Sequence, residues 1–319
     1  MDMVRNSQRM RVVALSNMVY YRTGSAKRCL FSLGGNMKTS IIIASHKAYT
    51  TPYDKMYLPL HVGAEGKDPL DGFTPDNTGD NISKKNPYYC ELTGMYWAWK
   101  NLDSDVIGLV HYRRYFTLQR KQYRKTHHWT DSVLTQAELE SLLSMYLEQT
   151  DDIRLSYTMI APKDFLLVPQ KRKYYIESLY SHYAHTFDGH HLDLSREIID
   201  KLCPEYLDAF DETMKQTWGY MWNMLIASRD VYDRYMSWLF PILEELEKEI
   251  DLSQLSSFEQ RLFGRVSEIL FNVWVNQEKR KGLLLMEIPV LHTVPENWPV
   301  KVKSFLSAKI FGKKYKASF

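Results

Sequence analysis

Two short, continuous runs of aliphatic residues constrain the fold of this chain more than any other feature. Residues 41–44 read Ile-Ile-Ile-Ala, and residues 106–110 read Val-Ile-Gly-Leu-Val. Runs of this length without alternating polar residues are typical of strands that are covered on both faces. Residues 88–101, just before the second run, have the spacing of a helix rich in aromatic residues. Buried strands connected through helices predict a sheet with helices packed on it.

The rest of the chain continues this alternation. Thr135 and Glu138 form a capping box ahead of apolar residues at helical spacing, which predicts a helix there. Further helices are predicted over 172–186, 193–217 (with Pro204 at a helix start), 230–250 (with a kink at Pro241) and 258–276. Further strands are predicted over 164–168, 221–227 and 283–291. We therefore expect an α/β fold with a sheet flanked by helices and a helix-rich C-terminal half.

Polar side chains follow both aliphatic runs. In sheets of this kind a ligand binds beyond the carboxyl ends of the strands. The residues at these positions are Ser45, His46 and Lys47 after the first run, and His111, Arg113 and Arg114 after the second. Arginine offers phosphate oxygens a planar fork of donors, so Arg113 and Arg114 are candidates for stabilising a leaving diphosphate. The alternatives are a salt bridge for the arginines and a hydrogen-bonded core position for His111.

Asp103-Ser104-Asp105 has the Asp-x-Asp form with which many sugar-nucleotide transferases hold Mg²⁺ or Mn²⁺. This motif precedes the second aliphatic run, whereas a metal motif belongs after the strand, so a turn is the favoured interpretation. We expect no metal ligands and no cofactor, with fixed cationic side chains in place of a metal. Mg²⁺ or Mn²⁺ is the less favoured alternative.

Residues 61–87 form a long loop rich in Gly, Asp, Asn and Pro. Four side chains in it suit hydrogen bonds to ribose, base or sugar hydroxyls: Asp76, Asn77, Asp80 and Asn81. The same residue types also build ordinary turns. Long structured loops are often functional, so we take these residues as candidates for substrate binding.

Two further groups are candidates for proton transfer. His182, His185, His190 and His191 lie close together with Asp188, without a standard zinc spacing; His190 and His191 are candidates for acid–base chemistry, and a polar surface segment is the alternative. Arg261, Arg265 and Glu268 share one face of a predicted helix. Glu268 is either a general base or part of a solvated salt-bridge ladder.

The charge is unevenly distributed along the 319 residues. Residues 1–36 carry six Lys or Arg and one acid, residues 301–319 carry six Lys and no acid, and the remainder has 37 acidic and 29 basic residues. An acidic body is unsuited to general nucleic-acid binding. Three scattered cysteines without metal spacing fit a reduced, cytoplasmic protein, and no apolar run is long enough to span a membrane.

The two ends are expected to differ from the body. Residues 1–36 end in Gly-Gly-Asn before Met37, which favours either a translated, non-native leader or a disordered basic arm. Residues 296–319 mix lysines with aromatic and aliphatic residues, which predicts a tail that binds an anionic membrane, with a frayed terminus as the alternative. The domain carrying the chemistry is expected over 37–295.

Several long stretches together resemble one known family. They are IASHK at 43–47, YLPLHVGA at 57–64, DNTGDNIS at 76–83, YCELTG at 89–94, YWAWKN at 96–101, IGLVHYRRYF at 107–116, PEY at 204–206, NM at 223–224, WLF at 238–240, and Gly264 with Ser267 and Glu268. The family is that of the capsular and O-antigen polysaccharide galactofuranosyltransferases, long catalogued as a domain of unknown function. The resemblance covers the chain from about residue 37 to about residue 295, and it adds Asn223 to the candidate substrate-binding residues.

The resemblance implies a GT-A-like, Rossmann-type fold and an inverting transfer of galactofuranose from UDP-galactofuranose. It implies as acceptor a glycan carried on a polyprenyl diphosphate, in capsule, exopolysaccharide or O-antigen synthesis. The enzyme would then be cytoplasmic and peripheral at the inner face of the cell membrane. Two alternatives are a transferase of the same fold with a UDP-pyranose donor and a non-catalytic glycan-binding assembly protein.

Overall fold

A computed structural model gives the fold of the chain. It describes residues 37–121, 127–149, 164–256 and 258–294, together with the backbone of strands between residues 13 and 29. The chain divides into two compact units. One comprises Lys38–Gln136 and Lys163–Phe319, and the other comprises Met1–Met37 and Ala137–Pro162.

The smaller unit contains strands β1 (Val13–Leu15), β2 (Met18–Thr23) and β3 (Ala26–Cys29), which pair in this order as an antiparallel sheet. Helix α4 (Gln136–Gln149), most of which belongs to this unit, begins directly after Thr135, where the capping box predicts a helix. The interpretation of residues 1–36 as a leader stays a prediction. The predicted tail over 296–319 lies outside the described residues.

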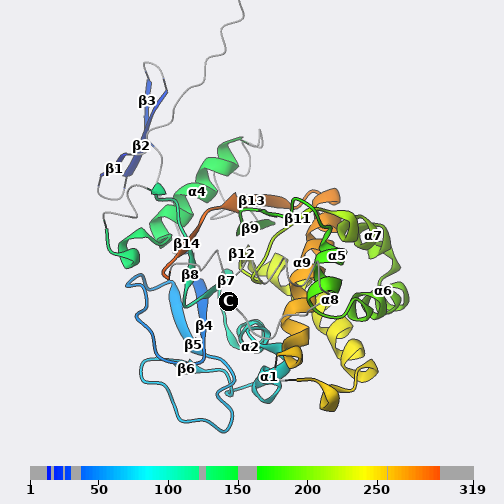
Figure 1. Ribbon diagram of the computed structural model, residues 1–319. Coiled ribbons are helices and arrows are strands. Elements are labelled where there is room, and N and C mark those ends of the chain that lie inside the picture. The colour runs from blue at the N-terminus through cyan, green and yellow to red at the C-terminus, as the bar shows by residue number, and fades with distance from the viewer. Residues whose placement is uncertain are drawn as a thin grey trace, which may run out of the picture. The chain divides into compact units, whose positions relative to one another are not determined.

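The larger unit is built on a mixed sheet with the strand order β13-β9-β12-β7-β4-β5-β6 (Figure 1). Strands β7, β4, β5 and β6 are parallel, and β12 runs antiparallel between β7 and β9. The bounds are β4 (Thr39–Ser45), β5 (Tyr57–His61), β6 (Thr74–Pro75), β7 (Val106–His111), β9 (Phe165–Pro169), β12 (Leu225–Ser228) and β13 (Leu284–Ile288).

The centre of the sheet confirms the two aliphatic runs as strands. Ile41, Ile42 and Ile43 are completely buried, so both faces of β4 are covered. Gly108 allows β12 to approach β7, because a Cβ atom at this position would lie 2.9 Å from the Leu225 carbonyl oxygen. The absence of a side chain here brings the start of β12 next to the end of β7.

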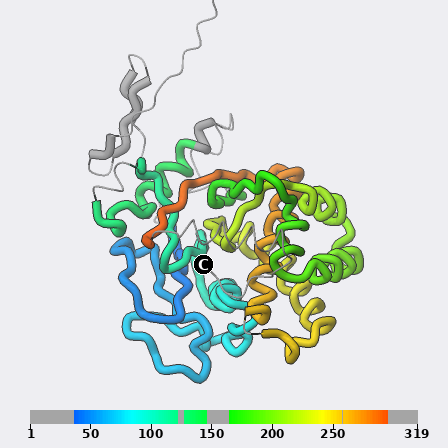
Figure 2. Tube along the Cα trace, in the orientation of Figure 1, coloured from blue at the N-terminus to red at the C-terminus, as the bar shows by residue number. Residues whose placement is uncertain are grey.

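A short ribbon joins the end of β7 to the last described strand. β8 (Arg114–Phe116) pairs with β7 and with β14 (Val290–His292). Figure 2 shows the orange-red end of the described chain running back along the sheet to this point. β8 and β14, which lie more than 170 positions apart in the sequence, are therefore neighbours at Arg114.

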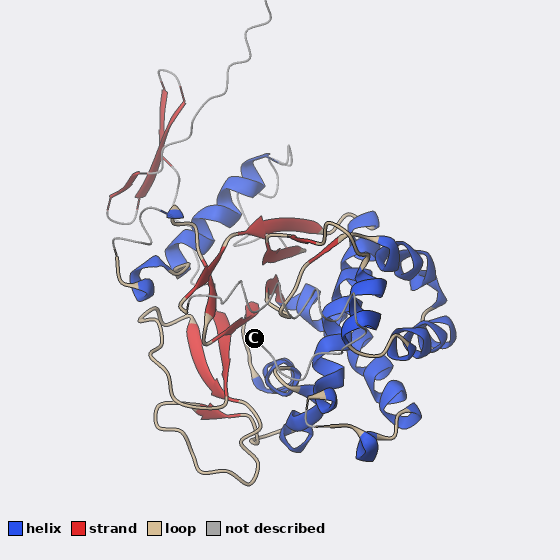
Figure 3. Cartoon of the chain, in the orientation of Figure 1, coloured by secondary structure: helices blue, strands red, loops and turns tan. Residues whose placement is uncertain are grey.

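Helices cover the sheet and dominate the C-terminal half, as the sequence predicts (Figure 3). They are α1 (Asn86–Tyr89), α2 (Leu92–Asn101), α5 (Leu179–Thr186), α6 (His190–Leu202), α7 (Leu207–Lys215), α8 (Arg229–Glu249) and α9 (Leu262–Arg280), with 3₁₀ turns at η1 (Ser83–Lys85), η2 (Trp129–Ser132), η3 (Pro204–Tyr206), η4 (Leu252–Gln254) and η5 (Glu259–Arg261). Within the described ranges no helix is long and apolar enough to cross a membrane.

Several element boundaries differ from the prediction. The helical stretch predicted over 193–217 consists of two helices, α6 and α7. Pro204 stands at the start of η3 between them, which confirms the predicted helix start there. Residues 172–173 form β10, which pairs with β11 (Trp218–Gly219), so the helix predicted over 172–186 begins only at Leu179. The strand predicted over 221–227 begins at Leu225. The helix predicted over 230–250 is confirmed as α8, with Pro241 inside it.

Candidate active site

The parallel strands bring the predicted polar residues to one edge of the sheet. Ala44 and His111 lie side by side in the register of β4 and β7, so the residues that follow each strand are neighbours. Ser45 is buried and its hydroxyl donates to the backbone oxygen of Lys47, whereas His46 and Lys47 are exposed. This is the edge at which ligands bind in open α/β sheets.

Trp222, just before β12, connects several of the candidate residues. Nε2 of His111 donates to the Trp222 carbonyl oxygen over 2.6 Å, and the Trp222 N–H donates to Glu268 over 3.1 Å. The Trp222 ring also contacts the Arg114 guanidinium, at 5.0 Å, and the ring of His292, at 5.5 Å. Because a carbonyl oxygen only accepts, His111 carries its proton on Nε2.

The backbone around this edge is strained. Among the described residues other than glycine, positive φ angles occur at Cys90 (52°), Trp222 (72°) and Asn223 (52°). The Asn223 side chain joins these two segments, since its Nδ2 donates to Glu91 over 2.8 Å and to the Gly264 carbonyl oxygen over 3.0 Å. Strained backbone persists where the surroundings hold it in place, and it gathers at functional sites.

Glu268 lies in α9 with a strongly perturbed acidity. Burial raises the pKa of its carboxyl to about 7, and the nearby charge of Glu91 acts in the same direction. The hydrogen bond from Trp222 and the positive charges of Arg114 and Arg172 oppose this rise without cancelling it. A carboxyl whose pKa lies near neutral pH is suited to accept and release protons.

Two further arginines approach the edge from the start of α9. Arg261 Nε lies 3.4 Å from the Cys90 sulfur, its hydrogen-bond acceptor. The Arg265 guanidinium lies between two rings, 4.0 Å from the centre of Phe187 and 3.9 Å from that of Phe258. Burial and the neighbouring Arg261 lower the pKa of Arg265 to about 10, so it still carries its charge at neutral pH.

The positive charge extends across the sheet to the end of β4. The pKa of His46 is lowered by burial and then by the charges of Lys47, Lys67, Arg113 and Arg261. Four cationic side chains therefore lie near His46 and form a positively charged region. Such a region attracts anions, phosphate groups among them.

Aromatic rings accompany these cations. Tyr49 stacks on Tyr112 with ring centres 4.1 Å apart. The Arg113 guanidinium lies 5.0 Å from the Tyr112 ring, and Lys47 Nζ lies 5.2 Å from the Tyr49 ring. The end of β4 therefore offers flat apolar faces and positive charge together, which suits a planar base attached to phosphates.

The buried member of the long loop binds other parts of the loop. The Asp76 carboxylate is fully buried and accepts from the N–H groups of Gly63 (2.8 Å) and Ala64 (3.0 Å), from the Thr93 hydroxyl (2.7 Å) and from the Ser83 hydroxyl. Four donors occupy the oxygens of this carboxylate. The arrangement argues against the predicted contact between Asp76 and a substrate, and it assigns Asp76 a part in closing the loop.

The other loop residues also have partners within the protein. Asn77 donates to Glu65 over 3.4 Å, Asp80 accepts from the Tyr96 hydroxyl over 3.1 Å, and Asn81 donates to a backbone oxygen of its own turn. Their roles in substrate binding stay predictions. Asn223 is buried and bound to Glu91, which gives it a structural role at the site whether or not it contacts a substrate.

The two candidate histidines of α6 have different surroundings. His190 is exposed. His191 is buried, with Nδ1 3.2 Å from the Tyr183 hydroxyl. Burial raises the pKa of Tyr183, and Glu268 is near enough to contribute. His191 thus approaches the candidate site through Tyr183, whereas no described contact links His190 to it.

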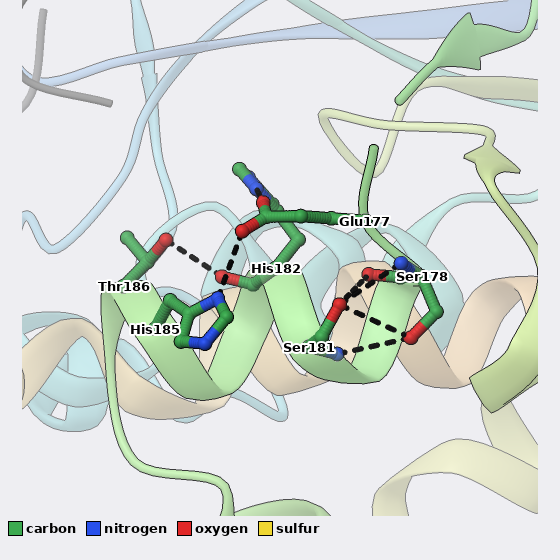
Figure 4. Close-up of polar contacts among 6 residues, drawn as sticks. All are labelled: Glu177, Ser178, Ser181, His182, His185 and Thr186. Carbon is green, nitrogen blue, oxygen red and sulfur yellow. Dashed lines mark hydrogen bonds and ion pairs between the residues drawn. The ribbon is translucent and has the colours of Figure 1, made fainter. Parts of the chain in front are cut away.

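A separate polar cluster lies at the start of α5 (Figure 4). The buried Glu177 carboxylate is bound by Nδ1 of His182 at 2.9 Å and by Nδ1 of His185 at 2.8 Å. Ser178 and Ser181 form a capping box at the same helix end. Glu177 therefore anchors both imidazoles and fixes the first turn of α5.

The Asp-x-Asp motif lies away from this edge. Asp103 pairs with the Lys38 side chain at 3.1 Å, and Asp105 accepts from the Lys38 N–H at 2.9 Å, at the beginning of β7. The candidate site lies beyond the end of the same strand. Among the residues whose placement is described, no group of three or more His, Cys, Asp or Glu could hold a metal ion.

Comparisons with known proteins agree with this architecture. The family described as "Domain of unknown function (DUF4422)" matches residues 40–280. The chain belongs to this family. The DUF4422 fold of the chain is also similar to the solved apo structure of the WbbM bifunctional glycosyltransferase, with a TM-score of 0.68 and 27% identity over 81% of this chain. The chain spans about half (46%) of the length of that protein, and no curated protein sequence matches it. The predicted α/β fold, a GT-A-like mixed sheet with helices on its faces, is confirmed.

The DUF4422 site contains residues that sequence reasoning did not select. Glu91, Cys90 and Trp222 carry no motif of their own, and Arg172 falls within the helix predicted over 172–186. Glu91 and Cys90 stand in the stretch YCELTG, which supports the family resemblance, so the signal for them lay in that resemblance alone. Trp222 binds His111 and Glu268 through its backbone atoms, and the identity of its side chain does not indicate these hydrogen bonds.

Proposed function

We propose that this DUF4422 protein is a glycosyltransferase that moves a sugar from a nucleotide diphosphate to a hydroxyl group of a glycan. The observation that carries this proposal is Glu268, a carboxyl with a pKa of about 7 held by the Trp222 N–H at the cationic edge of the sheet. The similarity to the WbbM glycosyltransferase supports the same reaction class.

The donor is proposed to bind at the ends of β4 and β7. The stacked rings of Tyr49 and Tyr112 would face the base, and His46, Lys47 and Arg113 would hold the phosphates. Charge that develops on a leaving diphosphate is stabilised best by donors fixed in advance. The ring contacts and hydrogen bonds of these side chains supply such fixed positions.

The transfer is proposed to be a single displacement with inversion. Glu268 accepts the proton of the acceptor hydroxyl, whose oxygen forms the new bond to the anomeric carbon. The bond from that carbon to the phosphate oxygen breaks, and the nucleoside diphosphate leaves with the electron pair. Arg113 and Arg114 compensate its charge, so we propose that the reaction needs neither Mg²⁺ nor Mn²⁺. Asp103 and Asp105 lie at the opposite edge of the sheet, which supports this assignment.

The family resemblance supports finer details of the proposal. The donor is UDP-galactofuranose, and the acceptor is a glycan on a polyprenyl diphosphate used for capsule, exopolysaccharide or O-antigen. The protein would act in the cytoplasm at an anionic membrane surface. A UDP-pyranose donor, or glycan binding without catalysis, are the alternatives that a donor panel separates.

The deciding experiment is product formation from UDP-galactofuranose and a lipid-linked acceptor mimic, with and without EDTA. Transfer that survives EDTA supports the donor and the metal-free mechanism together. Transfer abolished by EDTA keeps the enzyme but contradicts the role given to the arginines. If UDP binds and neither furanose nor pyranose donors are consumed, the catalytic proposal fails.

A further inference from the structure

Residues 171–176, here called the docking segment, expose apolar side chains on a fixed piece of backbone. The segment reads Lys-Arg-Lys-Tyr-Tyr-Ile and lies just beyond the end of β9, at the same edge of the sheet as the candidate site. Tyr175 is 91% exposed and Ile176 is 62% exposed. Of the other large hydrophobic residues in the described ranges, only Tyr53, at 83%, is more exposed than Ile176.

Backbone hydrogen bonds anchor the first half of the docking segment. Arg172 and Lys173 pair as β10 with β11. The Tyr174 N–H donates to the Thr217 carbonyl oxygen over 2.6 Å. The chain therefore enters the exposed tip from a paired strand.

The second half of the segment is fixed by the cluster in Figure 4. Glu177 follows Ile176 directly, and its buried carboxylate is bound by His182 and His185. Ser178 then caps α5. Tyr175 and Ile176 thus stand between two anchored points. Exposed apolar groups on a fixed tip are typical of an interaction surface.

The charge of the segment identifies the kind of partner. Its three cations are accompanied by no acidic residue within the segment. Lys171 is bound to Glu287 at 3.1 Å, whereas Arg172 and Lys173 are both exposed, with the Arg172 guanidinium 5.5 Å from the centre of the Tyr174 ring. Tyrosine and lysine side by side, with an aliphatic neighbour, are the residues that settle at the boundary between lipid head groups and acyl chains.

We propose that the docking segment binds an anionic phospholipid surface, with Lys173 among the head groups and Tyr175 and Ile176 inserted below them. The inference rests on the proposed function, because a lipid-linked acceptor would be presented at that surface. It assigns membrane contact to a described part of the domain, in addition to the tail predicted over 296–319. It also turns the edge that holds Glu268 toward the membrane.

The test is co-sedimentation of the full chain with vesicles of phosphatidylglycerol and phosphatidylcholine, compared with vesicles of phosphatidylcholine alone. We expect the double variant Tyr175→Ser/Ile176→Ser and the variant Lys173→Glu each to bind anionic vesicles about tenfold more weakly than the wild type. Tyr53→Ser is the matched control, since it removes an equally exposed tyrosine outside the segment, and its binding should not change.

The same variants are measured in a second background in which Lys313, Lys314 and Lys316 are changed to Glu. This background distinguishes vesicle binding by the docking segment from vesicle binding by the tail. If the segment variants bind like their parent in both backgrounds, or if the tail substitutions alone abolish all binding, the proposal is overturned.

Vesicle binding requires neither donor nor acceptor, so its outcome is independent of the proposed reaction. Transfer to a soluble acceptor should continue in Tyr175→Ser/Ile176→Ser. A loss of that transfer together with a lower Tm would mean that the segment supports the fold, which also contradicts the proposal.

Discussion

The backbone N–H of Trp222 donates a hydrogen bond of 3.1 Å to the carboxylate of Glu268. The same residue accepts from His111 through its carbonyl oxygen, and its φ angle of 72° lies in the left-handed region. Glu268 is thereby held by a turn whose conformation costs energy, on the order of 1–3 kcal/mol for such a residue. The position of the proposed base depends on this turn.

Glu268→Gln should lower kcat by a factor of about 10² to 10⁴, because Gln keeps the bond from Trp222 and cannot accept the proton. Donor affinity, measured by calorimetry with UDP, should stay within about threefold. Glu278→Gln is the matched control on the same helix: Glu278 is buried against Tyr206 and Lys281, and its change should lower the Tm and leave kcat similar. Equal activity of Glu268→Gln and wild type would remove Glu268 as the base.

The pH dependence of kcat/KM should show an ascending limb centred near pH 7, because Glu268 must be ionised to act as a base. This limb should be missing from any residual activity of Glu268→Gln.

The stability of the fold should change with pH in the opposite sense to the activity. The folded-state pKa lies above the unfolded value, so the native state loses stability as the pH rises through about 7. Thermal unfolding at pH 5 and pH 8 checks this: the Tm of Glu268→Gln relative to the wild type should be higher at pH 8 than at pH 5. The same Tm difference at both pH values would contradict the assignment.

Arg113→Ala and Arg114→Ala should affect different steps. Arg113 is exposed beside the Tyr112 ring, so its loss should weaken UDP binding about tenfold and make that binding less dependent on salt. Arg114 contacts the Trp222 ring, so its loss should lower kcat more than donor affinity. Arg113→Lys serves as the control that restores charge without the planar fork. Salt-dependent calorimetry with UDP and initial rates measure both effects, and unchanged values for both alanine variants would exclude this part of the mechanism.

Asp76→Asn should destabilise the fold by about 2–4 kcal/mol, since the new amide group would face N–H and hydroxyl donors instead of accepting from them. The Tm reports this loss, and the affinity of the folded fraction for UDP should stay similar. Asp80→Asn is the comparison, because Asp80 is exposed and its Tm should not shift. A normal Tm with weakened UDP binding in Asp76→Asn would restore Asp76 as a substrate contact.

The centre of the sheet was predictable because its signal is local. Residues 41–43 are buried on both faces and are therefore apolar without interruption, and 106–110 follow the same rule. The rule that ligands bind beyond such strands then selected His46, His111 and Arg113 correctly as members of one edge. These inferences require only the order of residues along the chain.

The contacts that complete the site were not predictable, because they depend on distant segments. Glu91 meets Asn223 across 132 positions, and Trp222 meets Glu268 across 46. Asp76 illustrates the same limit: a short polar residue in a loop can face a ligand or close the loop, and only the positions of Gly63, Ser83 and Thr93 distinguish the two. Residue type fixes what a side chain can bind and leaves open which partner it meets.

The pairing of β14 with β8 has a consequence for how the protein is made. His292 stands beside Trp222, and β14 borders the strand that begins with Arg114. A nascent chain that has been synthesised only to the end of α9 contains every proposed reacting residue but lacks this border. Activity should therefore appear late in translation, after residue 292 has left the ribosome, and polypeptides that stop earlier should transfer no sugar to an acceptor.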